Sequence, residues 1–276
     1  MTDGWQPTGA TRLAAVIGDP VRHSLSPTLH NAAFRHLDLD WVYVALPVTA
    51  GRAGDAVAAM RVMGIDGLSV TMPHKQAVAA AVDVLTPAAA ALGAANTVYR
   101  DGDRLVGDNT DGAGFVRSMR SQLGFDPHEA AVTVLGAGGA AVAVALALLE
   151  GGATVTIVNR SAERARAAVA ATGGRAVIGE LGAVRRADLV VQATPLGMQA
   201  SDPLPVDPSL IRAGQLVADL IYHPAETPLL AAARSRGAVA VNGVGMLLFQ
   251  AGEQFRRWTG YEPPIDVMAA AVGLDL

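Results

Sequence analysis

Residues 131–149 read AVTVLGAGGAAVAVALALL, and this stretch decides the fold of the chain around it. A β-branched run leads into a glycine-rich turn, and small apolar residues follow the turn. Twenty residues, from Ala130 to Leu149, carry no charge, which is long enough for a membrane span. The turn in the middle instead predicts a buried strand over 131–135 and a buried helix over 139–149.

The turn itself reads GAGGAA over residues 136–141 and fits the pattern G-x-G-x-x-G/A between a strand and a helix. Glycines at these places allow a tight turn and let backbone N–H groups approach a pyrophosphate at the helix N-terminus. The pattern therefore predicts a dinucleotide site. The residues expected against the cofactor are Gly136, Gly138, Gly139 and Ala140. A tight turn that only packs the helix on the strand is the alternative.

The next predicted strand, 153–158, ends at Asn159-Arg160-Ser161, where an NAD enzyme carries Asp or Glu for the ribose hydroxyls. No carboxylate occupies that corner. Arg160 and Arg164 are four residues apart, and a helix starting at Ser161 would place both on one face. Charge-assisted hydrogen bonds to a ribose 2′-phosphate are worth about 1.5–3 kcal/mol each, so the pair predicts NADP as the cofactor. A solvated arginine face is the alternative.

Strand-like and helix-like segments alternate on both sides of this unit. Such alternation predicts an α/β protein with mostly parallel sheets covered by helices. The predicted strands cover 13–17, 41–46, 67–72, 188–192, 215–219 and 238–241, with a hairpin over 96–107 that turns at Asp101-Gly102. The predicted helices cover 27–37, 54–63, 111–123, 245–258 and 265–272, the first with Ser26 as N-cap before Pro27. Two short helices are also predicted between the strand 67–72 and the hairpin, the second starting at Thr86-Pro87.

Composition narrows the class of protein. The chain has 276 residues, which suggests two domains, and 51% hydrophobic against 17% charged residues excludes a disordered protein. The net charge is −4 and no cluster of Lys and Arg could neutralise a row of phosphates, so nucleic acid is not an expected partner. There is no cysteine, and the N-terminus lacks the apolar core of a secretory signal. The protein is expected to be soluble and cytoplasmic.

One basic residue stands out, because Lys75 is the only lysine among 21 basic residues. Arginine can replace lysine wherever a surface charge suffices, but guanidinium stays protonated and cannot take up or release a proton near neutral pH. A lone lysine in this background is therefore a candidate for proton transfer. An ordinary surface lysine is the alternative.

Four polar clusters lie at the ends of predicted elements, outside the dinucleotide unit. Ligands of open α/β sheets bind outside the carboxyl ends of strands, so these clusters predict a site for a polar ligand. Ser26 could instead serve only as an N-cap, and Asn96 only as a turn residue. The clusters cover residues 23–27, 69–75, 95–97 and 107–112.

Eight motifs in order carry a resemblance to a known family. They are G-D-P-x-x-H-S-x-S-P-x-x-H-N, V-T-M-P-x-K, G-A-A-N-T, G-D-N-T-D-G, G-A-G-G-A, N-R-S, A-T-P-x-G-M and N-G-x-G-M-L-x-x-Q, from Gly18 to Gln250. Together they resemble the shikimate dehydrogenase family, which includes quinate dehydrogenases. Single motifs are weak, but the ordered set is highly specific.

The resemblance implies reversible NADPH-dependent reduction of 3-dehydroshikimate to shikimate, a step of chorismate and aromatic amino acid biosynthesis. It also implies an N-terminal α/β substrate domain of residues 1–110 plus 246–276, and a Rossmann-type, doubly wound NADP-binding domain of residues 111–245. The expected partner is a small molecule, and the protein would be a monomer or homodimer. A quinate or aminoshikimate dehydrogenase, or a non-catalytic NADP-binding regulator, are the alternatives.

The resemblance further implies roles for single residues and no metal site. Lys75 and Asp111 match the acid–base pair of the family, and loss of a hydride from an alcohol requires such a proton acceptor within about 3 Å of the oxygen. The residues that match substrate contacts are Ser24, Ser26, Thr71, Asn96, Asp111, Tyr222 and Gln250. Those expected at the cofactor, besides the glycine turn and the two arginines, are Asn159, Thr194 and Gly245.

Two positions depart from the family pattern. Ser69 stands where asparagine is common, although serine can still make the local hydrogen bonds. Pro195 replaces a frequent serine in the loop expected near the nicotinamide. The related quinate and aminoshikimate enzymes often carry threonine at the position of Ser26, so Ser24 together with Ser26 favours shikimate.

Overall fold

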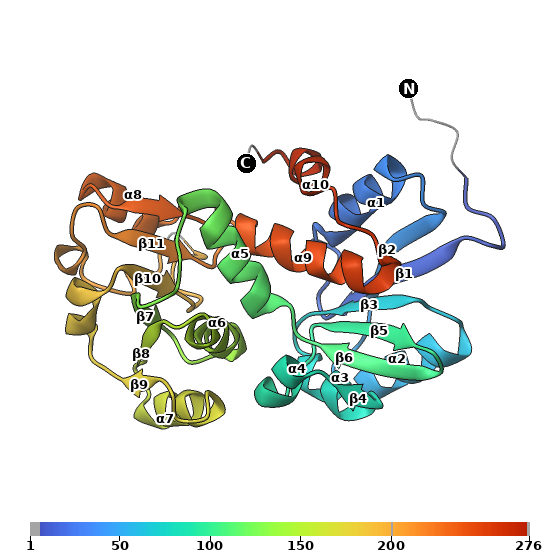
Figure 1. The fold of residues 1–276 in the computed structure, drawn as a ribbon, viewed down its shortest axis with the longest axis horizontal. Coiled ribbons are helices and arrows are strands. Elements are labelled where there is room, and N and C mark those ends of the chain that lie inside the picture. Colours follow the sequence, from blue (N-terminus) through green and yellow to red (C-terminus); the bar gives the residue numbers. More distant parts are fainter. Residues whose placement is uncertain (1–5, 200, 275–276) are drawn as a thin grey trace. The chain divides into compact units, whose positions relative to one another are not determined.

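The computed structural model describes residues 6–199 and 201–274 (Figure 1). The chain divides into two compact units. Unit 1 comprises Met1–Thr110 and Leu248–Leu276, and unit 2 comprises Asp111–Leu247. A six-stranded sheet lies in each unit, so the predicted α/β class is confirmed.

Unit 1 is built on a mixed sheet in the order β2-β1-β3-β5-β6-β4. Its elements are β1 (Arg12–Gly18), α1 (Ser26–His36), β2 (Trp41–Pro47), α2 (Ala53–Val62), β3 (Gly67–Val70), α3 (Lys75–Ala81), β4 (Val84–Leu85), α4 (Pro87–Leu92), β5 (Thr97–Asp101), β6 (Arg104–Asp108), most of α9 (Val244–Thr259) and α10 (Ile265–Ala271). β5 runs antiparallel to β3 and β6, whereas the other pairs are parallel. Because Asp101 pairs with Arg104, the hairpin turns at Gly102 and Asp103, one residue later than predicted.

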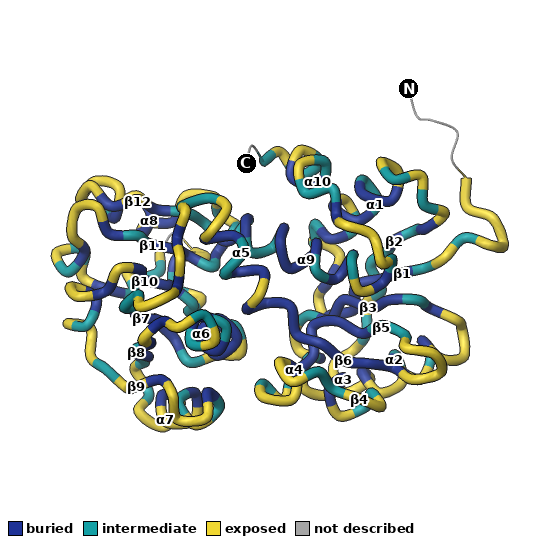
Figure 2. Tube along the Cα trace, viewed as in Figure 1, coloured by how far each residue is buried: buried dark blue, intermediate teal, exposed yellow. Residues whose placement is uncertain are grey.

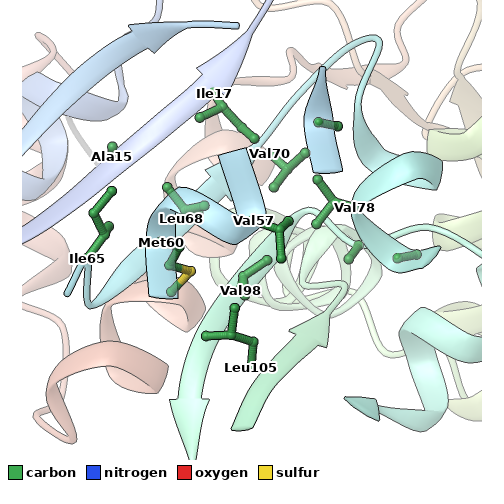
Figure 3. Packing of buried hydrophobic residues seen from close by; sticks show 13 residues of the cluster. Ala15, Ile17, Val57, Met60, Ile65, Leu68, Val70, Val78, Val98 and Leu105 are labelled. Carbon is green, nitrogen blue, oxygen red and sulfur yellow. The ribbon is translucent and has the colours of Figure 1, made fainter. Parts of the chain in front are cut away.

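The core of unit 1 lies where α2 and α3 cover one face of this sheet, as Figure 3 shows. Ile17 from β1 and Leu68 from β3 pack there with Met60 from α2 and Val78 from α3. Burying each such side chain contributes about 1.5–3 kcal/mol. All four residues of β3 are buried, so the polar segment that begins at Thr71 extends from a strand inside the core (Figure 2).

Unit 2 is a fully parallel sheet in the order β12-β11-β10-β7-β8-β9. Its elements are α5 (Asp111–Leu123), β7 (Ala131–Leu135), α6 (Gly139–Glu150), β8 (Thr154–Val158), α7 (Ala162–Ala171), β9 (Val177–Ile178), η1 (Leu181–Arg186), β10 (Leu189–Gln192), η2 (Pro208–Leu210), β11 (Leu216–Asp219), α8 (Pro228–Ser235), β12 (Val239–Val241) and the first residues of α9. The chain passes from β7 to β8 on one side and later returns to place β10 on the other. This is the doubly wound arrangement predicted, with its switch point between β7 and β10.

The long uncharged stretch is divided as predicted, into the buried strand β7 and the helix α6. No helix within the described part of the chain has both the length and the apolar character to cross a membrane.

One α-helix of the described residues, α8, was not predicted from the sequence. Thr227 caps α8 by accepting a hydrogen bond from the Leu230 N–H, and Pro228 occupies the first turn. The Thr-Pro pair was the signal, because Thr86-Pro87 starts α4 in the same way.

Candidate active site

The polar segments of unit 1 meet at one edge of its sheet. Ser69 at the end of β3 pairs with Thr97 at the start of β5, and Thr97 pairs with Asp108 at the end of β6. The residues that follow β3 and β6 and those that precede β5 therefore lie side by side. The clusters predicted from the sequence at 69–75, 95–97 and 107–112 converge in this way.

Asn96 is held by hydrogen bonds on every side. Its side-chain Oδ1 accepts from the Thr110 N–H at 2.9 Å and from the Thr97 hydroxyl at 2.8 Å, and its Nδ2 donates to Thr110 Oγ1 at 3.1 Å. Only 2% of the residue is exposed. Two internal donors therefore occupy Oδ1, so the orientation of this amide is fixed from within unit 1.

Lys75 is the first residue of α3 and is half-buried. Its carbonyl accepts from the Ala95 N–H at 2.9 Å, which joins the lysine segment to the residue before Asn96. The neighbouring His74 is buried, and its imidazole Nε2 lies 2.7 Å from the Val48 carbonyl. His74 thus anchors the loop that begins at Thr71, and it leaves Lys75 as the residue of this pair suited to proton transfer.

The serine pair lies at the start of α1, where one expectation is wrong. Ser26 is not the N-cap, because the helix begins at Ser26 itself and Leu25 precedes it in a helical conformation. Instead, Ser24 Oγ accepts from the Ser26 N–H at 3.2 Å, so the Ser24 hydroxyl hydrogen can be donated to a substrate carboxylate. Ser26 is buried, and its hydroxyl hydrogen-bonds to Tyr43.

The remaining substrate-site candidates divide between the two units. Gln250 lies on α9 in unit 1, and its carbonyl accepts from Thr110 Oγ1 at 3.2 Å. Asp111 is the first residue of α5 in unit 2 and is 8% exposed. Tyr222 follows β11 in unit 2 and is half-buried.

The glycine turn of unit 2 leaves space for a ligand. Gly136 has a φ of +121°, and a Cβ there would lie 2.9 Å from the Ala193 carbonyl oxygen, so this position requires glycine. A Cβ on Gly138 or Gly139 would meet nothing within 4 Å, and Gly138 caps α6 without a side-chain hydrogen bond. The N-terminus of α6 therefore has no side chain over its first turn, which leaves room for an anion to approach the first N–H groups of the helix. Ala140 lies in the first turn of the same helix.

The corner after β8 lies beside this turn, because the Gly136 N–H donates to the Val158 carbonyl at 2.8 Å. Helix α7 begins at Ala162 with Ser161 as its N-cap, so Arg160 precedes the helix and Arg164 lies in its first turn. The expectation that both arginines lie on one face of the helix is therefore wrong, because Arg160 is in the loop and only Arg164 is in the helix. Both arginines are exposed, and neither makes an ion pair with any described residue. Two guanidinium groups at this corner fit a 2′-phosphate.

Side-chain hydrogen bonds to backbone carbonyls hold the corner after β8 and the loop after β10. Asn159 Nδ2 donates to the Ser161 carbonyl at 3.0 Å, which shapes the β8 corner. The buried Gln192 is the last residue of β10. Its Nε2 donates to the carbonyls of Thr194 at 3.1 Å and Leu196 at 2.8 Å in the loop that follows the strand. The sequence analysis missed Gln192, although a polar residue at the end of the apolar run LVVQ was a usable signal.

Gly245 has a packing role in the structure. A Cβ there would overlap Gln122 Nε2 and Ser118 Oγ, which lie on α5, so glycine lets α9 approach α5 closely. No group of three or more His, Asp or Glu residues in the described part of the chain is arranged to hold a metal ion.

A buried histidine, His30, lies among aromatic rings one turn of α1 after Ser26. His30 is fully buried and stacks on Tyr43 with ring centroids 4.5 Å apart, and Trp258 lies 5.0 Å from it. Neither ring nitrogen makes a hydrogen bond of normal geometry with a described residue, although the Gln254 side chain is nearby. Burial lowers the pKa of His30 to about 3, so this imidazole is neutral at physiological pH.

Comparisons with known proteins agree over most of the chain. Three family models match: the shikimate dehydrogenase substrate binding domain over residues 16–98, shikimate / quinate 5-dehydrogenase over 119–198, and the shikimate 5′-dehydrogenase C-terminal domain over 243–272. The NADP(+) shikimate dehydrogenase of Geobacter metallireducens is 43% identical over 96% of this chain and 97% of that protein. Its counterpart in Rubrobacter xylanophilus is 45% identical, with 96% of each chain covered.

Solved structures show the same similarity. A shikimate dehydrogenase in complex with NADP+ has a TM-score of 0.91 at 34% identity, covering 97% of this chain and 96% of that chain. Shikimate 5-dehydrogenase from Thermus thermophilus, in complex with NADP(H) and shikimate, has a TM-score of 0.88 at 35% identity, covering 95% and 98%. Quinate dehydrogenase from Corynebacterium glutamicum, in complex with NAD, has a TM-score of 0.86 at 32% identity, covering 95% and 98%.

Proposed function

Because the chain belongs to the shikimate dehydrogenase family, we propose that it catalyses the reversible NADP-dependent interconversion of shikimate and 3-dehydroshikimate. Unit 1 binds shikimate and unit 2 binds NADP, and the reaction serves chorismate and aromatic amino acid biosynthesis. The observation that carries the proposal is the sheet edge of unit 1. There Asn96 is locked by hydrogen bonds beside the segment that bears the only lysine of the chain.

Proton transfer falls to Lys75 and Asp111. NADP+, when bound, supplies the acceptor for the hydride that leaves the carbon of the reacting hydroxyl. Lys75 takes the proton of that hydroxyl, and Asp111 is the carboxylate of the acid–base pair. In the reductive direction the same pair returns the proton to the carbonyl oxygen of 3-dehydroshikimate.

The other polar residues hold the two ligands. Ser24 and Ser26 donate to the substrate carboxylate, and Ser26 must turn its hydroxyl from Tyr43 to do so. The residues that hold the ring hydroxyls or complete the site are Thr71, Asn96, Asp111, Tyr222 and Gln250. The residues that hold NADP are Gly136, Gly138, Gly139 and Ala140 at the pyrophosphate, Asn159, Arg160 and Arg164 at the 2′-phosphate, and Thr194 and Gly245 near the nicotinamide.

The test is a steady-state assay of nicotinamide absorbance with shikimate and NADP+. Lys75→Ala should lower kcat by roughly 10²–10⁴, the usual contribution of a general acid or base, while the affinity for NADP+ persists. Gln76→Ala, which changes the exposed neighbour, is the matched control and should retain wild-type turnover. Turnover of Lys75→Ala within threefold of wild type would refute the assignment of the base.

Two alternatives give different results in the same assay. A quinate or aminoshikimate dehydrogenase would show a higher kcat/KM for one of those substrates than for shikimate. A non-catalytic NADP-binding regulator would bind NADP and turn over none of the three. The pairing of Ser24 with Ser26 supports shikimate.

Location and assembly also remain predictions. We place the enzyme in the cytoplasm, without membrane or nucleic-acid partners, as a monomer or homodimer. Cell fractionation tests the location, and size-exclusion chromatography with light scattering tests the assembly.

A further inference from the structure

A chain of buried hydrogen bonds runs through unit 1 beneath Asn96. The Tyr43 hydroxyl donates to Ser69 Oγ at 2.6 Å, and the Ser69 hydroxyl donates to Gln254 Oε1 at 2.6 Å. Gln254 Nε2 then donates to the Asn96 carbonyl at 3.2 Å. Three of the four residues are not among the substrate contacts, and all four are buried.

The donors and acceptors in this series of hydrogen bonds follow from its last acceptor, the Asn96 carbonyl. A backbone carbonyl can only accept, so the Gln254 amide must turn its nitrogen toward Asn96 and its oxygen toward Ser69. Ser69 must then donate to that oxygen and accept from Tyr43. Each group satisfies the next one, so the Gln254 amide has a single favourable orientation.

The main chain at Asn96 is thereby held from both sides. Its carbonyl accepts from the Val70 N–H at 2.7 Å as well as from Gln254. Helix α9 makes a second connection one turn earlier, where the Gln250 carbonyl accepts from Thr110 Oγ1. Thr110 in turn binds the Asn96 side chain. Helix α9 thus braces both the main chain and the side chain of Asn96.

We propose that Gln254 is a positioning residue for the reaction, which fixes Asn96 at the place where it contacts a ring hydroxyl of the substrate. This inference rests on the proposed function, because it takes Asn96 as a substrate contact. Without the Gln254 N–H, the Asn96 carbonyl loses one of its two donors, and the start of β5 gains freedom to shift. A shift of this kind weakens substrate binding without touching the cofactor unit.

The first experiment compares two variants of α9. Gln254→Met keeps the length of the side chain and removes both hydrogen bonds. Trp258→Phe is the matched control one turn further along α9, because it removes the Trp258 Nε1 donor to the Val98 carbonyl at 3.0 Å, two residues after Asn96. Thermal unfolding of both variants records their structural cost.

Gln254→Met should raise the KM for shikimate by about tenfold or more, with a smaller change in kcat and a KM for NADP+ within twofold of wild type. Trp258→Phe should leave the KM for shikimate within twofold of wild type, even if its Tm falls as far as that of Gln254→Met. Equal KM values for Gln254→Met and wild type, or equal increases in both variants, would overturn the positioning role.

Gln254→Glu adds a test that a purely structural role would not pass, and it replaces the methionine variant if that variant fails to fold. A protonated carboxyl at position 254 can donate to the Asn96 carbonyl, whereas an ionised one cannot. The titratable groups near this side chain are His30 and Tyr43, and both are neutral in this range, because burial lowers the pKa of His30 to about 3 and raises the pKa of Tyr43. The ratio of the variant KM for shikimate to the wild-type KM at the same pH should therefore be near one at about pH 6 and rise as the pH approaches about 9. A ratio that is constant across this range would count against the proposal.

The two hypotheses fail in different ways. A wild-type enzyme that does not oxidise shikimate overturns the proposed function and this inference together. An active wild type whose Gln254 variants keep the wild-type KM for shikimate overturns only the positioning role.

Discussion

Lowering the pH should destabilise unit 1 through His30. Burial among aromatic rings lowers the pKa of this imidazole to about 3, whereas an unfolded histidine titrates near 6.5. Below about pH 6.5 the unfolded chain binds a proton that the folded protein refuses, so the free energy of unfolding falls as the pH falls. The stabilising contribution is fully present above pH 6.5 and is lost progressively towards pH 3. Between pH 8 and pH 5 the loss is about 2 kcal/mol.

The assay is urea unfolding followed by tryptophan fluorescence at these two pH values. Both tryptophans of the described residues, Trp41 and Trp258, lie in unit 1, so the signal reports the unit that contains His30. His30→Phe keeps a ring in the aromatic stack and removes the titrating nitrogens, so it should lose about 2 kcal/mol less than wild type on acidification. His36→Gln, at the exposed end of the same helix, is the control and should follow wild type. The same pH dependence in His30→Phe and wild type would refute the reasoning.

The other predictions concern the cofactor unit. Arg160→Asp should shift the ratio of kcat/KM values for NADP+ and NAD+ toward NAD+ by roughly a hundredfold, because it removes a charge-assisted hydrogen bond and adds a repelling charge. Arg166→Asp on the exposed surface of α7 is its control, and an unchanged ratio in Arg160→Asp would remove the arginine argument. Gly138→Val should leave the Tm within a few degrees of wild type but raise the KM for NADP+, because a side chain there fills only open space. Gly245→Val should lower the Tm more strongly, because its side chain overlaps α5; the reverse order of the two Tm values would contradict this distinction.

Local patterns predicted most of the elements and the residues of the proposed cofactor site. The strand, turn and helix over residues 131–149 follow from β-branched residues, glycines and alanines that are neighbours in the chain. The same holds for the corner at Arg160, which the motif places directly after a strand. The predicted start of the following helix was one residue too early, because Ser161 caps α7 and the helix begins at Ala162.

The substrate site was predictable only in part. The clusters at 69–75, 95–97 and 107–112 could be identified as polar segments beside strands, and the motif order assigned roles to their members. The reversal of β5 in the sheet and its register against β3 and β6 brought the clusters together, and no periodicity in the sequence specifies that register.

The sequence by itself determined the alternation of strands and helices, the glycine turn and the lone lysine, because each depends on residues close together in the chain. Only the tertiary structure decided that Ser69 hydrogen-bonds to Gln254, 185 residues away, and that His30 is buried without charge. Hydrogen bonds and burial at such separations depend on which helix packs on which sheet edge. The packing of helices on the sheet depends on the free energy of the whole core, so it cannot be predicted from residues that are neighbours in the chain.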